Sequence, residues 1–124
     1  MARAKALPAR AISIRQPYVE LILRGKKKAE YRSQPTRIMG PVLIYASLKP
    51  AESPGDWRKV GKTPGQLPTG KLVGVVEITG CDWDARRRCY AYSLRSPRPL
   101  KRHLVATNQP SPRFWRPKLS RSGK

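Results

Sequence analysis

The sequence predicts an α+β fold, a small barrel built mostly from β-strands with short helices. The chain has 124 residues, the usual length of one domain. Several short runs of apolar and β-branched residues have the length of strands, and one early segment has helical spacing. With 39% apolar residues the chain can fill one modest core, and no internal repeat indicates a second domain.

The N-terminal part is predicted to form a strand that leads into a short helix. Residues 11–14, AISI, are apolar and β-branched, which is typical of a strand. Pro17 suits the first turn of a helix, because its missing N–H would have no partner there. Apolar residues follow at helical spacing in 18–22, and Gly25 stands where a helix is expected to stop.

The remaining strands are predicted from apolar runs and from alternation. Residues 27–32 alternate in a way that fits a strand and would place Lys28, Glu30 and Arg32 on one face. The other predicted strands are 41–47, which we expect to be buried on both faces, 71–81, 89–94 and an edge strand at 113–115.

Two stretches are predicted to lack regular structure. Residues 48–70 are rich in Pro, Gly and Lys, and Trp57 is their only large apolar anchor. Loops of this length in small domains are usually functional or mobile. Pro97, Pro99 and later prolines are expected to limit regular structure in the C-terminal part. Gly74 predicts a bulge or bend in its strand.

Net charge is the dominant feature of the composition. The 27 Lys and Arg residues against 7 Asp and Glu give a net charge of +20. Such self-repulsion favours an anionic partner, with nucleic acid as the first candidate and an anionic membrane surface as the second. No acidic residue follows Asp84, so the last third of the chain resembles a phosphate-binding arm or, alternatively, a solubilising tail.

Several classes of protein are not expected. No segment has the roughly 18 to 20 apolar residues that cross a bilayer, and the N-terminus has no apolar core of a secretory signal. We therefore expect a cytoplasmic protein that does not enter membranes, with free thiols. Cys81, Cys89 and His103 are irregularly spaced, so we expect no metal and no cofactor.

The segment SIRQPYVELILRGKKKAEYRS, residues 13–33, resembles the opening signature of ASCH domains, which belong to the PUA-like superfamily. The later segments IYAS, GVVEITGC and YAYSLRSPRPL, followed by FW-x-P, are also similar to that family. The resemblance covers 11–117 and implies one PUA-like mixed β-barrel with short helices, flanked by basic flexible tails at 1–10 and 118–124. It also implies an RNA-binding cleft lined by the G-K-K-x-x-E-x-R segment.

The chemistry of that segment fits a polyanion. The ammonium of Lys27 can lie over a phosphate or a base carbonyl, and the planar fork of Arg32 suits bidentate binding. Glu30 can orient either cation or accept a base amine. The predicted nucleic-acid-binding residues are Ser13, Arg15, Gln16, Tyr18, Lys26, Lys27, Lys28, Arg32, Tyr45, Arg86, Arg87 and Arg88.

Other interpretations of the same residues stay open. Glu30 and Arg32 form only a surface ion pair if the segment lies on a solvated strand. Tyr18 fits the core as well as a stacking platform, and Trp57 and Trp83 are expected to be packing residues.

Three kinds of function remain. The first is a module that binds RNA or, less favoured, single-stranded DNA. The second is an enzyme, either a metal-independent ribonuclease that uses Lys27, Glu30 and Arg32, or an amidohydrolase acting on a modified nucleoside, as the resemblance implies. In the latter, Glu30 occupies the family's threonine position and no acid follows Asp84, so that activity is disfavoured. The third is non-specific coating of nucleic acid or anionic membrane.

Overall fold

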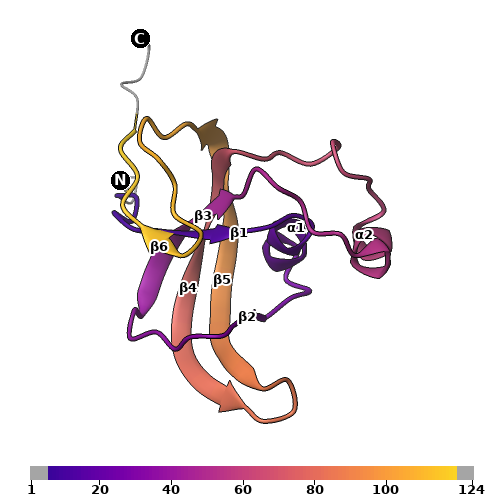
Figure 1. Ribbon diagram of the computed structural model, residues 1–124. Helices are drawn as coiled ribbons and strands as arrows, with labels where there is room; N and C mark the ends of the chain where they lie inside the picture. Colours follow the sequence, from indigo (N-terminus) through magenta and orange to yellow (C-terminus); the bar gives the residue numbers. More distant parts are fainter. Residues whose placement is uncertain (1–5, 120–124) are drawn as a thin grey trace.

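The computed structural model describes residues 6–119 as one mixed sheet with two short helices on one side of it (Figure 1). The sheet has six strands in the order β2-β5-β4-β3-β1-β6. The elements are β1 (Ala11–Ile14), α1 (Tyr18–Leu23), β2 (Ala29–Arg32), β3 (Gly40–Ala46), α2 (Pro54–Val60), β4 (Lys71–Asp84), β5 (Cys89–Leu104) and β6 (Phe114–Trp115). The expected α+β class is confirmed.

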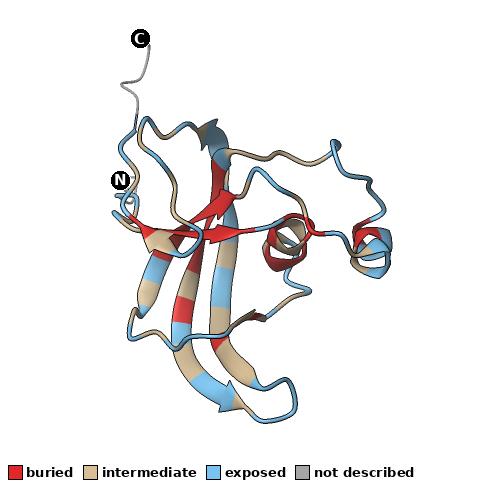
Figure 2. Ribbon diagram, viewed as in Figure 1, coloured by how far each residue is buried: buried red, intermediate tan, exposed pale blue. Residues whose placement is uncertain are grey.

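The core lies where β1, β3 and β4 run side by side. β1 pairs in parallel with β3, and β3 pairs antiparallel with β4. All four residues of β1 are buried, and so are residues 42–46 of β3 (Figure 2). The prediction that β3 is buried on both faces is confirmed. Ile14 and Ile44 pack there with Val19 and Ile22 of α1.

The expected barrel is not confirmed, because the strands that end the sheet, β2 and β6, do not pair with each other. The two ends nevertheless approach one another. The Arg32 guanidinium, from β2, donates to the carbonyl oxygen of Ser13 in β1 at 2.6 Å and to that of Pro112 before β6 at 3.1 Å. A side chain thus connects the two ends where a barrel would have main-chain hydrogen bonds.

β4 and β5 form a hairpin that extends beyond the rest of the sheet (Figure 1). The prediction that regular structure stops after residue 94 is wrong, since β5 continues to Leu104. Ser96 has a φ of 53°, and neither it nor Pro97 has a partner in the register with β4, so a bulge absorbs the first proline. The register also shifts between Leu72 and Gly74, where a bulge was predicted.

The predicted loop at 48–70 contains a helix that the sequence analysis missed. Pro54 occupies the first turn of α2, and Gly61 ends the helix with a φ of 66°. Trp57 anchors it, buried against Leu21 of α1, with its indole N–H donating to the Ala51 carbonyl. Among residues 6–119, neither helix has the length and apolar character that a bilayer crossing requires.

Candidate nucleic-acid interface

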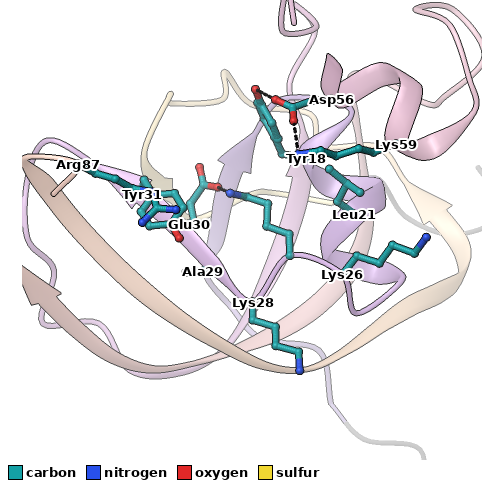
Figure 3. Close-up of a pocket in the computed structure, with 11 residues that line it drawn as sticks. Tyr18, Leu21, Lys26, Lys28, Ala29, Glu30, Tyr31, Asp56, Lys59 and Arg87 are labelled. Atoms are coloured by element: carbon teal, nitrogen blue, oxygen red, sulfur yellow. Dashed lines mark hydrogen bonds and ion pairs between the residues drawn. The ribbon is translucent and has the colours of Figure 1, made fainter. Parts of the chain in front are cut away.

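A hollow of about 860 Å³ lies between the edge strand β2, the two helices and the β4–β5 turn; we call it the β2 pocket. Figure 3 shows Asp56 and Lys59 on one side of it, and Tyr31 and Arg87 on another. Its lining residues are Tyr18, Leu21, Lys26, Lys27, Lys28, Ala29, Glu30, Tyr31, Asp56, Lys59 and Arg87. The structure therefore brings the predicted cationic segment together with side chains from distant parts of the chain.

The turn after α1 places three lysines along the pocket, and Figure 3 shows the side chains of Lys26 and Lys28 extending outward from its edge. Gly25 has a φ of 75° and donates its N–H to the Ile22 carbonyl, while the N–H of Lys26 reaches the Leu21 carbonyl. This pair of bonds is the Schellman motif, which requires a left-handed residue at the glycine position. In the G-K-K segment the glycine therefore ends α1, and the two lysines that follow it line the pocket.

Lys27 lies at the centre of the pocket and is only 18% exposed. Its Nζ is 5.2 Å from the centre of the Tyr18 ring and 4.7 Å from that of Tyr31. The same Nζ is 3.8 Å from Oε1 of Glu30. Burial lowers the pKa of Lys27, and Glu30 partly opposes that shift. Two aromatic faces and one carboxylate thus stabilise a cation that burial disfavours.

Asp56 organises the α2 side of the pocket. It accepts hydrogen bonds from the hydroxyls of Tyr18 at 2.8 Å and Ser53 at 2.9 Å, and from Lys59 at 3.0 Å. The bond from Lys59 and those from the two hydroxyls lower the pKa of Asp56 to about 2. Burial, followed by the hydrogen bond to Asp56, raises the pKa of Tyr18. Tyr18 is therefore a fixed wall that joins α1 to α2.

The β4–β5 turn supplies the opposite wall. Asp84 accepts hydrogen bonds from the main chain of Arg87 at 3.0 Å and from its side chain at 2.9 Å. These bonds hold the pKa of Asp84 below its usual value. The Arg87 guanidinium lies 4.3 Å from the centre of the Tyr31 ring. Arg86 and Arg88 are exposed in the same turn, but of these three predicted arginines only Arg87 lines the pocket.

Glu30 is buried and bonded to both of its predicted partners. One carboxylate oxygen is 3.8 Å from Lys27, and the other accepts from Arg32 at 3.0 Å. Arg32 does not line the β2 pocket, because its remaining nitrogens bind the carbonyls of Ser13 and Pro112. The Glu30–Arg32 pair is therefore neither a free surface pair nor an open ligand fork; it holds the two ends of the sheet together.

Several other predicted ligands lie elsewhere. Ser13 is buried, where it accepts from the Trp115 indole at 3.0 Å. Gln16 is also buried, and its amide oxygen accepts the Glu20 N–H at 3.1 Å in the first turn of α1. Tyr45 packs edge-on against Trp115 in the core. Arg15 is exposed and does not line the β2 pocket.

The sequence analysis missed Tyr31, Asp56 and Lys59 as lining residues. Asp56 and Lys59 lie in the segment that was predicted as a loop, where an N-terminal proline and a glycine stop around Trp57 could have indicated a helix. Tyr31 was placed on the strand face opposite Glu30, but at the sheet edge both side chains reach the pocket. Among residues 6–119 no group of three or more His, Cys, Asp or Glu side chains could hold a metal ion.

Comparison with known proteins gives one family. No curated protein matches the chain. A family model for the ASCH domain matches residues 12–107, from β1 to the region after β5. Because this match covers more than half of the sequence, the chain belongs to the ASCH domain family, a family of PUA-like domains.

Proposed function

We propose that the protein binds RNA, with single-stranded DNA as a weaker ligand, and that the β2 pocket and the surrounding lysines and arginines are the contact surface. Membership of a PUA-like family that is usually linked to RNA binding supports this proposal. The net charge of +20 supports it independently, since phosphate contacts release condensed counterions.

One observation carries the proposal: both acids of the pocket are already bonded within the protein. Glu30 contacts Lys27 and Arg32, and Asp56 is bonded to Lys59 and two hydroxyls. Lys26 and Lys28, which are exposed in the lining, have no ion-pair partner within residues 6–119. Positive charge therefore borders the hollow, where the phosphates of a bound strand can contact it.

The experiment measures fluorescence anisotropy of a labelled single-stranded RNA at two salt concentrations. We expect affinity to fall steeply with salt, as it does when several phosphates are contacted. Lys28→Glu should weaken binding more than Lys101→Glu, the same charge reversal at an exposed residue far along β5. Equal losses from the two variants would instead support non-specific coating, and no binding at low salt would reject the proposal.

Arg121 and Lys124 belong to the predicted basic tail and lie outside the described residues, so Lys101 is the matched control. Lys27→Ala should also weaken binding, because it removes the central cation of the pocket. Its folded fraction must be checked by circular dichroism, since Glu30 would lose one of its two partners.

A ribonuclease activity is a second candidate, favoured by the contact between Lys27 and Glu30. In that reaction Glu30 would move a proton while Lys27 stabilises the charge on the phosphate. The carboxylate of Glu30 already contacts Lys27 and Arg32, so a substrate hydroxyl would have to compete with those contacts. Labelled RNA incubated with and without chelator tests the idea, and cleavage that persists in Lys27→Ala would assign the activity to another site.

A further inference from the structure

Trp83 stands out as an exposed tryptophan near the tip of the β4–β5 hairpin. It is 55% exposed, whereas Trp57 and Trp115 are 6% and 8% exposed. Trp83 was predicted to be a packing residue, but more than half of its surface is exposed. Its ring meets that of Tyr90 on the neighbouring strand, with centroids 5.1 Å apart and an angle of 69° between the planes. A cross-strand aromatic contact covers one part of the indole and leaves the rest open.

The register fixes which face of the hairpin carries this tryptophan. Cys81 is opposite Tyr92, and Trp83 is opposite Tyr90. Because side chains alternate along a strand, these four side chains lie on one face. The segment between β2 and β3 crosses that face, since the Tyr92 hydroxyl donates to the Gln34 carbonyl and the N–H of Thr36 to the Cys81 sulfur. Trp83 therefore lies one pleat beyond this crossing segment.

A second basic hollow, of about 520 Å³, adjoins the same crossing segment; we call it the β2–β3 hollow. Its lining includes Arg37, Arg113 and Tyr92, and it contains no carboxylate. Neither Arg37 nor Arg113 has an ion-pair partner in the described part of the chain. Within residues 6–119, the one hydrogen bond from the Arg113 side chain goes to the Gln34 amide oxygen, at 3.4 Å. The hollow thus offers two uncompensated guanidinium groups.

We infer that Trp83 is a stacking platform for an unpaired base, and that Arg37 and Arg113 bind phosphates of the same single strand. This inference rests on the proposed function and adds a second contact to it, from residues that do not line the β2 pocket. Bases inside a duplex cannot stack on a side chain, so the ligand class is single-stranded RNA. Base stacking on an aromatic residue tolerates any sequence, and phosphate contacts set the path of the backbone.

The experiment uses the emission of Trp83, because the other tryptophans are buried. Titration of the full chain with a short single-stranded oligoadenylate should quench the tryptophan emission of the wild type. Trp83→Phe should keep most of the affinity and lose the quenching, since a smaller ring still stacks. Trp83→Leu should bind roughly 5- to 150-fold more weakly, the range reported for one stacked base. Val105→Ala, which removes a side chain from a residue that is 53% exposed, should bind like the wild type.

The outcomes separate this inference from the proposed function. Binding by anisotropy without quenching of Trp83 overturns the platform and leaves RNA binding intact. If the wild type does not bind single-stranded RNA even at low salt, both the platform and the proposed function are overturned. Equal quenching by a double-stranded RNA of the same length would also overturn the inference. The slope of log affinity against log salt concentration reports the number of phosphates contacted. Arg37→Gln combined with Arg113→Gln should make this slope shallower by about one to two contacts, and an unchanged slope excludes their role.

Discussion

Arg32 donates from its guanidinium to the main-chain carbonyl of Ser13 at 2.6 Å, although the two residues lie on strands near opposite ends of the sheet order. A second nitrogen reaches the Pro112 carbonyl, and the Nε binds Glu30. The planar guanidinium has donors on three nitrogens that point to three separate acceptors. The single nitrogen of a lysine ammonium cannot reach the same three acceptors. The arginine of the G-K-K-x-x-E-x-R segment therefore connects the sheet ends while its glutamate and lysine remain with the pocket.

Replacing Arg32 should lower stability more than it changes RNA contacts. Arg32→Lys keeps the charge but loses the fork, and we expect the free energy of unfolding to fall by about 2 kcal/mol, the scale of a hydrogen bond that involves a charged group. Urea unfolding measures this change. Arg98→Ala, an exposed arginine of β5, should leave the unfolding midpoint almost unchanged.

The same pair of variants tests the alternative that Arg32 is a ligand residue. If Arg32→Lys unfolds like the wild type but binds RNA much more weakly, its guanidinium contacts the ligand directly. The opposite pattern, a lower midpoint with nearly unchanged affinity of the folded protein, supports the connecting role.

Much of the fold follows from local sequence signals. The strands at 11–14 and 41–47 are predicted because β-branched residues are continuous there, and both are buried in the structure. The helix after Pro17 and its glycine stop are predicted from their positions alone. The extent of β5 is not, because a bulge at Ser96 accommodates a proline that would otherwise end the strand.

The site is less predictable, because tertiary contacts select its members. Lys27 and Glu30 are found from their spacing and from the family resemblance, and they do meet in the β2 pocket. Arg87 is predicted as well, from its basic run, and the β4–β5 turn brings it beside β2. Asp56 joins them only because α2 packs on α1, and its distance along the chain carries no local signal. Tyr45 illustrates the reverse case, since its place in an apolar strand fits a core residue and a stacking residue equally.

Gly74 and Gly80 of β4 offer a matched test of core packing. A Cβ at Gly74 would come within 2.9 Å of the Arg98 carbonyl oxygen and 2.7 Å of Leu23, closer than real contacts allow. A Cβ at Gly80 would meet its neighbours no closer than 3.7 Å. Gly74→Ala should cost about 1–3 kcal/mol of stability by overpacking, whereas Gly80→Ala should be neutral or slightly stabilising.

Thermal and urea unfolding measure the stability of the two glycine variants against that of the wild type. A Gly74→Ala protein as stable as the wild type would show that β5 moves away from β4 at little cost. That result would contradict the tight approach of the two strands at this point.

Asp56 should contribute a component of acid sensitivity. Its pKa falls from 3.8 to about 2 on folding, so the folded state binds protons less readily than the unfolded chain. The resulting stabilisation is present above about pH 4 and is lost as the pH falls towards 2. With a side chain that is 24% exposed, we expect about 1 kcal/mol after allowance for solvent screening.

Urea unfolding between pH 5 and pH 2 measures this contribution against a variant that lacks it. Asp56→Asn should show a shallower loss of stability over this range and a lower stability at neutral pH, because the amide oxygen replaces only one of two acceptors. Glu52→Gln changes the net charge equally at an exposed position of the same segment and should follow the wild type. Identical acid profiles for the wild type and Asp56→Asn would show that the Tyr18 and Lys59 bonds contribute nothing in solution.

Lys27 should make RNA affinity sensitive to alkaline pH. Burial lowers its pKa below the ordinary 10.5, so it loses its charge at a lower pH than a free lysine side chain does. The neutral amine no longer attracts phosphate, and affinity should fall as the pH rises through this lowered pKa. Lys27→Arg keeps a cation over the whole range, so its affinity should lack this fall. A 2′-O-methyl RNA withstands the alkaline buffers, and anisotropy at constant ionic strength gives the two profiles. Coincident profiles would place the ligand away from Lys27, because every other titrating group is the same in both proteins.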